Sequence, residues 1–178
     1  ESHPMIMIVT GIIGISLSSI FVKFSDAPSA VTAAWRLLWT VLLMLPMVLG
    51  KGALRREIAR ADKKSALISA CSGLFLAAHF ILWFDSLSKT TVASATTLVC
   101  TEVIWVSLGF CLFLKGRLTG KAVGAIAATL LGSVLIAWSD SARGALYGDI
   151  LALAAAIAVA VYTLLGRVVR GSLSTTVY

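Results

Sequence analysis

The chain has 178 residues, of which 59% are hydrophobic and only 13% are charged, and its mean hydropathy is +0.98. A soluble domain of this length would carry about a quarter charged residues, so the composition excludes an ordinary soluble globule. The formal net charge of +7 does not indicate a nucleic-acid-binding protein, because the basic residues are confined to short segments between apolar runs.

Six apolar runs are each long enough to cross a bilayer as a helix, and the alternation typical of barrel strands is absent. The first run has no preceding Lys or Arg and is too long for a signal-peptide core, so we expect a spanning helix there. We therefore predict an all-α integral membrane protein with six transmembrane helices, with Ser29 and Ser65 as N-caps of the second and third. The approximate ranges are 5–24, 29–50, 65–87, 90–114, 120–138 and 147–170.

The basic residues predict the orientation. Eleven of them lie in the connections at 51–64 and 115–121 and at the end of the sixth run, whereas the opposite side carries Lys23, Lys89 and Arg143. By the positive-inside rule the richer side is cytoplasmic. The sequence thus predicts a multi-pass protein of the cell inner membrane with a cytoplasmic N-terminus.

Polar and aromatic residues share one face of the second, third and fourth helices at helical spacing. The candidate binding residues are Arg36, Trp39, His79, Trp83, Thr101, Glu102 and Trp105. In the third helix this face also includes Ser65, Ser72 and Ser86. In the fourth helix Val92, Val99 and Val103 fall on the other side, which we expect to face lipid.

Glu102 is the only charged residue in the apolar run from Thr90 to Leu114. At 1.5 Å per residue it lies roughly 18 Å into the membrane, whereas Arg36 and His79 lie roughly 10–12 Å from the outer surface. An ionised side chain at such depth costs about 2.5–3.5 kcal/mol on insertion scales. We therefore expect the three polar faces to line a shared internal cavity.

Small residues recur every four positions in the last two helices, which lets helix backbones approach closely, although alanine is common in any membrane helix. The two stripes are Gly120, Gly124, Ala128 and Gly132, and Gly148, Ala152, Ala156 and Ala160. We expect both stripes to pack against neighbouring helices.

Motifs of catalysis are missing from the sequence. No GxSxG, HExxH or GxxxxGK[ST] occurs, so neither an enzyme nor an ATP-driven pump is indicated, and no cofactor is expected. Cys71, Cys100 and Cys111 lie in apolar runs with no CxxC and no nearby His, which favours packing over a disulfide or a metal site.

Three stretches resemble the EamA-type drug/metabolite transporter family: "AAWRLLW" at 33–39, "HFILWFDSLSKTTVASATTLV" at 79–99 and "FLKGRL" at 113–118. Two positions depart from the family pattern. Val103 replaces a proline common in the fourth helix, which removes the usual reason for a kink, and Gly116 replaces a common glutamate, which removes a polar contact at the inner end.

The resemblance implies an EamA/DMT-like bundle, usually built of ten helices as two inverted five-helix repeats. On that basis residues 1–140 form the first repeat, residues 141–178 form the first helix of a second, incomplete repeat, and the chain is expected to be truncated. It also implies a gradient-driven secondary transporter or exporter of small amino-acid-like or amphiphilic metabolites. The expected partners are such a substrate and the lipid bilayer, and a homodimer would supply a second half-site.

In this interpretation Arg36 holds a carboxylate, His79 and the tryptophans contact the body of the substrate, and Glu102 holds an amine or a coupled proton or cation. The alternative is a non-transporting membrane subunit whose polar residues, such as an Arg36–Glu102 pair, only stabilise helix packing. An intramembrane enzyme is a third class, for which the sequence offers no second histidine placed as a base.

Overall fold

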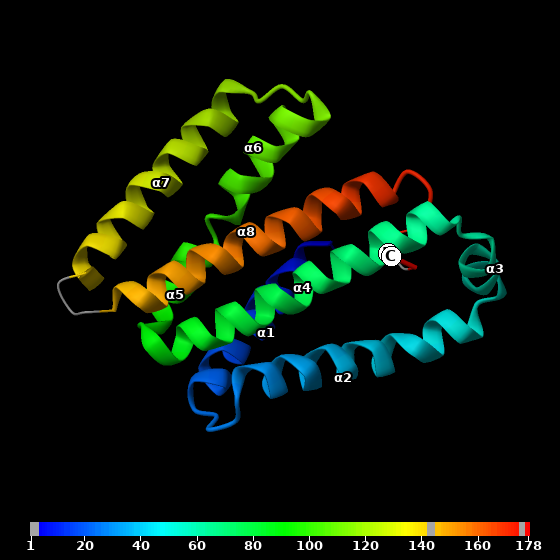
Figure 1. Cartoon of the computed structure of the whole chain (residues 1–178), viewed down its shortest axis with the longest axis horizontal. Helices are drawn as coiled ribbons and strands as arrows, with labels where there is room; N and C mark the ends of the chain where they lie inside the picture. The colour runs from blue at the N-terminus through cyan, green and yellow to red at the C-terminus, as the bar shows by residue number, and fades with distance from the viewer. Residues whose placement is uncertain (1–3, 142–144, 175–176) are drawn as a thin grey trace.

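The computed structural model describes residues 4–141, 145–174 and 177–178, which contain helices and no strand. Helices occur at all six predicted positions, so the predicted all-α class is confirmed (Figure 1). The fourth run is divided in two, and one connection holds an additional short helix. The bounds are α1 (Pro4–Lys23), α2 (Ser29–Gly50), α3 (Gly52–Arg60), α4 (Lys63–Lys89), α5 (Val92–Val99), α6 (Glu102–Leu114), α7 (Gly120–Ser141) and α8 (Leu146–Val169).

Several helices have the length and composition of membrane spans. Within the described residues, four segments are long and apolar enough to cross a bilayer, and α7 adds a shorter apolar segment, Gly120–Leu135. The four are Ser29–Gly50, Lys63–Lys89, Val92–Leu114 and Leu146–Val169. Large apolar side chains stay exposed on the outer helix faces, as at Leu131 and Trp138. Such faces suit a lipid environment, and the chain is a multi-pass membrane protein.

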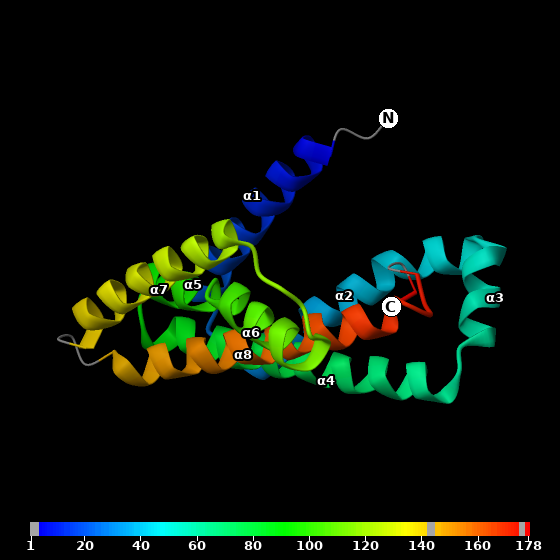
Figure 2. The same cartoon turned by 90° about the horizontal axis from the view of Figure 1, so that it is seen from above.

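The centre of the structure is the antiparallel pair α4 and α8, which run side by side with α2 along the other side of α4 (Figure 1). Figure 2 shows α1 pointing away from the other helices toward its N-terminal end. The core joins large side chains of α4 to alanines of its neighbours, so large residues fill the space that small ones leave. Its buried members are Trp83, Phe84 and Leu87 with Ala33, Ala95 and Ala155.

The caps of the spanning helices differ from the prediction. Asp62, not Ser65, is the N-cap of α4, and its side chain accepts a hydrogen bond from the Ser65 backbone N–H at 3.4 Å. Carboxylates are as good as hydroxyls at this position, and here the carboxylate lies one turn earlier. Ser29 is likewise the first residue of α2 rather than its cap, which is Pro28.

The helix predicted over 90–114 breaks at Cys100–Thr101, although no proline is present. Thr101 donates its hydroxyl to the Leu98 carbonyl at 2.6 Å, and its backbone N–H bonds to the same carbonyl at 3.1 Å. Hydroxyl side chains compete with helical hydrogen bonding in this way. The predicted lipid face is wrong in α5, where Val92 and Val99 pack against the core, whereas Val103 of α6, beyond the break, is 56% exposed.

The two stripes of small residues have different outcomes. In α8 the members Gly148, Ala152, Ala156 and Ala160 are all buried, which confirms the prediction there. In α7 a Cβ added at Gly120, Gly124 or Gly132 would meet nothing within 4 Å, so that prediction is wrong for the described structure. Small residues permit close approach, but a neighbouring helix must also lie on that side.

Candidate functional site

The polar face predicted for α4 is buried, as Ser65, Ser72, His79, Trp83 and Ser86 all have little exposed surface. This face lies against α8 and the segment that follows it. His79 Nδ1 is 2.9 Å from the Ala155 carbonyl oxygen of α8, so in the tautomer that protonates Nδ1 the ring donates a hydrogen bond across the pair. Ser65 and Ser72 bond to the hydroxyls of Ser172 and Tyr178. The face is therefore packed rather than open.

Arg36 reaches the neighbouring side of α4 from α2. Its guanidinium carbon lies 4.8 Å from the centroid of the Phe80 ring, a cation–π arrangement, and Nη1 donates to the Ser18 hydroxyl of α1. Phe80 in turn lies 5.0 Å from His79 and 6.4 Å from Trp83, between ring centroids. The structure thus brings Arg36, His79 and Trp83 into one cluster around Phe80, which we call the Phe80 cluster.

Two tryptophans of the prediction have opposite environments. Trp83 is 4% exposed, and its indole Nε1 is buried without a hydrogen-bond partner among the described residues. Trp39 is 56% exposed on the outer side of α2. A buried indole N–H normally finds an acceptor, so Trp83 has an unused donor within the Phe80 cluster, whereas Trp39 lies outside it.

Thr101, Glu102 and Trp105 form a second group at the break between α5 and α6. Glu102 is half-buried and is the first residue of α6, where the helix dipole favours a negative charge. Trp105 Nε1 is also buried without a partner in the described part of the chain. A hollow of about 280 Å³ lies beside this group. It is lined by Leu98, Thr101, Ile104, Trp105, Leu130, Ser133, Val134 and Leu153.

The structure therefore separates the seven predicted residues. Arg36, His79 and Trp83 gather around Phe80 of α4, with Arg36 entering from α2 and His79 bonded to α8. Thr101, Glu102 and Trp105 lie at the break between α5 and α6, and Trp39 lies outside both groups. Arg36 and Glu102 form no ion pair; the described residues contain one ion pair, between Lys89 and Asp85. The polar face of α4 is turned toward α8, and an internal cavity shared by all three polar faces stays a prediction.

One polar junction was missed by sequence reasoning. Asp149 of α8 is 2% exposed and accepts a hydrogen bond from the Thr90 hydroxyl at 2.9 Å, and Lys23 of α1 donates to the Thr90 carbonyl at 3.0 Å. Lys23 also donates to the Leu87 carbonyl at the end of α4. We call Lys23, Thr90 and Asp149 the end junction. The sequence feature that could have predicted this junction is Asp149 itself, a carboxylate in the first turn of an apolar helix.

A comparison with protein families gives a match to the model described as the EamA-like transporter family, over residues 3–138. No curated protein and no solved structure matches the chain.

Proposed function

The chain belongs to the EamA-like transporter family, and we propose that it is a gradient-driven secondary transporter that exports small amino-acid-like or amphiphilic metabolites. The family points to a transporter rather than an enzyme. Substrates of such proteins bind near mid-membrane, where the protein must offer polar groups within an apolar bundle. Export across the cell inner membrane and coupling to a proton or cation are parts of this proposal.

The Phe80 cluster is the observation that carries the proposal. It places the guanidinium of Arg36 from α2 beside the imidazole of His79 and the unbonded indole N–H of Trp83 from α4. A guanidinium offers a planar fork that matches a carboxylate, and the rings offer contact area for the apolar part of a metabolite. Arg36 is half-buried and one of its five N–H groups donates to Ser18, so the guanidinium has further donors with which to bind a carboxylate.

The alternative function, a subunit without transport, is favoured by a separate set of contacts. Arg36 bonds to Ser18 and His79 lies against the Ala155 carbonyl, so both ionisable groups already connect neighbouring helices. Interhelical polar contacts contribute about 0.6–2 kcal/mol each, which is enough to retain them for packing alone. In that case no small metabolite would bind at this cluster.

Ligand-induced stabilisation separates these two functions. The thermal unfolding of the purified protein is measured with each of a panel of amino acids and primary amines. We expect the compounds that carry a carboxylate to raise the midpoint temperature of unfolding. A ligand at one hundred times its Kd adds about 2.7 kcal/mol of stability. Arg36→Ala should abolish this gain, and Arg36→Lys should nearly abolish it, because lysine lacks the planar fork.

Arg167→Ala is the matched control. Arg167 also lies over an aromatic ring, with its guanidinium carbon 4.3 Å from the Phe110 centroid, but it lies in the last turn of α8. This variant should keep the full ligand response. A panel that stabilises no variant, or a response lost equally in Arg167→Ala, would support the packing function instead.

The proposed orientation gives a labelling prediction. Ala27, in the connection before α2, should be external, and Ala59 of α3 should be cytoplasmic; both are exposed. In protein whose native cysteines are replaced by alanine, A27C should react with an impermeant thiol reagent added to intact cells. A59C should react only after the membrane is opened. The reverse pattern would overturn the cytoplasmic N-terminus.

A further inference from the structure

The connection between α2 and α4 contains a feature absent from the sequence prediction, the helix α3. Figure 2 shows α3 lying across the ends of α2 and α4 rather than extending either of them. Both of these helices are long and apolar enough to span a bilayer. A helix that crosses their ends lies at the level of the lipid headgroups, close to the plane of the membrane surface.

The two sides of α3 differ in chemistry. Leu54 and Ile58 are four residues apart and share one side, and Ile58 is 49% exposed. Arg56 and Arg60, also four apart, share the opposite side and are exposed. An amphipathic helix with arginines on its polar side is typical of a segment that lies in the membrane interface.

Charge in this connection is strongly unbalanced. Residues 51–64 contain six basic residues but only two acidic ones, Glu57 and Asp62. Glu57 accepts hydrogen bonds from the backbone N–H and the hydroxyl of Ser174, the latter at 2.9 Å. Asp62 accepts from Ser65, which lowers the pKa of the Asp62 carboxyl. Both carboxylates are thus held by neutral donors, and no basic residue of 51–64 has an ion-pair partner within the described chain.

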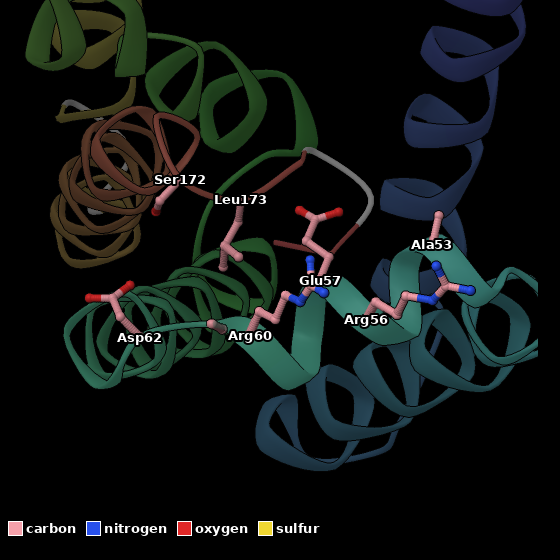
Figure 3. A pocket seen from close by; sticks show the side chains of 8 residues that line it. Ala53, Arg56, Glu57, Arg60, Asp62, Ser172 and Leu173 are labelled. Carbon is pink, nitrogen blue, oxygen red and sulfur yellow. The ribbon is translucent and has the colours of Figure 1, made fainter.

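Arg56 and Arg60 line a hollow of about 480 Å³ between α3 and the segment after α8. Figure 3 shows Arg56, Glu57 and Arg60 projecting from α3, with Ser172 and Leu173 contributed by the other wall. Guanidinium groups bind phosphate by paired N–H donors. The Ser172 hydroxyl adds none, because it donates to the Val169 carbonyl at 2.9 Å. The hollow therefore has the donors that a phosphate requires.

From this placement we propose that α3 binds an anionic phospholipid of the cytoplasmic leaflet, with Arg56 and Arg60 as the ligands of the headgroup phosphate. Clusters of basic residues directly beside a spanning helix attract anionic lipids through the negative surface potential of that leaflet. The apolar side of α3 adds selectivity for a lipid over a soluble anion, because Leu54 and Ile58 can contact the acyl chains. This inference does not depend on the proposed transport activity.

Native mass spectrometry of the purified protein in detergent tests the proposal, with phosphatidylglycerol and phosphatidylcholine titrated separately. The wild type should retain phosphatidylglycerol in preference to phosphatidylcholine. The double variant Arg56→Gln/Arg60→Gln should bind phosphatidylglycerol more weakly by about fivefold for each arginine removed. Its melting midpoint is recorded alongside, since both side chains are exposed and the fold should be kept.

The double variant Arg117→Gln/Lys121→Gln is the control, because it removes the same charge from the other basic connection. It should retain the affinity of the wild type for phosphatidylglycerol. Millimolar inorganic phosphate should leave the bound lipid in place. The proposal is overturned if both double variants lose affinity equally, if the α3 variant loses none, or if inorganic phosphate displaces the lipid.

Discussion

Replacing Gly148 with valine is expected to destabilise the helix bundle by about 1–3 kcal/mol, the usual cost of overpacking. A Cβ at this position would lie 2.8 Å from the Lys89 carbonyl carbon and 2.8 Å from the Thr90 Cβ. Backbone at the end of α4 cannot rotate away as a flexible side chain can. The substitution must therefore push α8 away from α4, and with it Asp149, which accepts the Thr90 hydroxyl.

Gly124→Val of α7 is the matched control, because a Cβ there meets nothing within 4 Å. Reversible unfolding in mixed detergent micelles measures both variants against the wild type. The control should stay within about 0.5 kcal/mol of the wild type, as is usual for surface substitutions. Equal losses in the two variants would show that the α4–α8 contact at Gly148 is not as close as described.

Replacing Glu102 with glutamine should abolish the response of transport to a pH gradient while leaving substrate binding in place. Glutamine keeps the shape and the hydrogen-bonding capacity of the side chain but cannot ionise. Glu102 is the one carboxylate of Val92–Leu114, lies half-buried at the start of α6, and has no ion pair with Arg36 or His79 in the described structure. Its charge can therefore change without breaking the Phe80 cluster.

Flux through the full-length protein, measured in liposomes with and without an imposed pH gradient, gives this comparison. In the wild type the gradient should accelerate flux, and in Glu102→Gln the two rates should be equal. Asp85→Asn is a suitable control, since Asp85 pairs with Lys89 near the end of α4 and both side chains are partly exposed. Glu102 has no coupling role if the glutamine variant keeps the full pH dependence.

The sequence predicted the helices and the buried face of α4 because both follow from regular patterns. Apolar runs of about twenty residues leave few alternatives to a spanning helix. The helix α4 runs without interruption from Lys63 to Lys89. The angle of 100° per residue therefore holds along its length and places His79 and Trp83 on the same side. The burial of Gly148 and its partners on α8 follows from the same regularity.

The parts that could not be predicted depend on local hydrogen bonds or on neighbouring helices. The break at Thr101 accompanies a hydroxyl that bonds to the carbonyl three residues back, a local hydrogen bond that periodicity does not reveal. The glycines of α7 have the right spacing but no neighbour, and spacing alone does not supply one. Asp149 and Lys23 lie far apart in the sequence, and the end junction exists because the fold brings α1, α4 and α8 together.

The most direct measurement is the uptake of radiolabelled amino acids and amines into liposomes that contain the full-length protein, with an imposed pH gradient. We expect at least one compound to move at a rate that requires the protein and falls when an ionophore removes the gradient. Arg36→Ala should lose that flux while Arg167→Ala keeps it, at matched amounts of folded protein. Folded protein that moves none of these compounds, with no difference among the wild type and the two variants, would contradict the proposal that the Phe80 cluster serves transport.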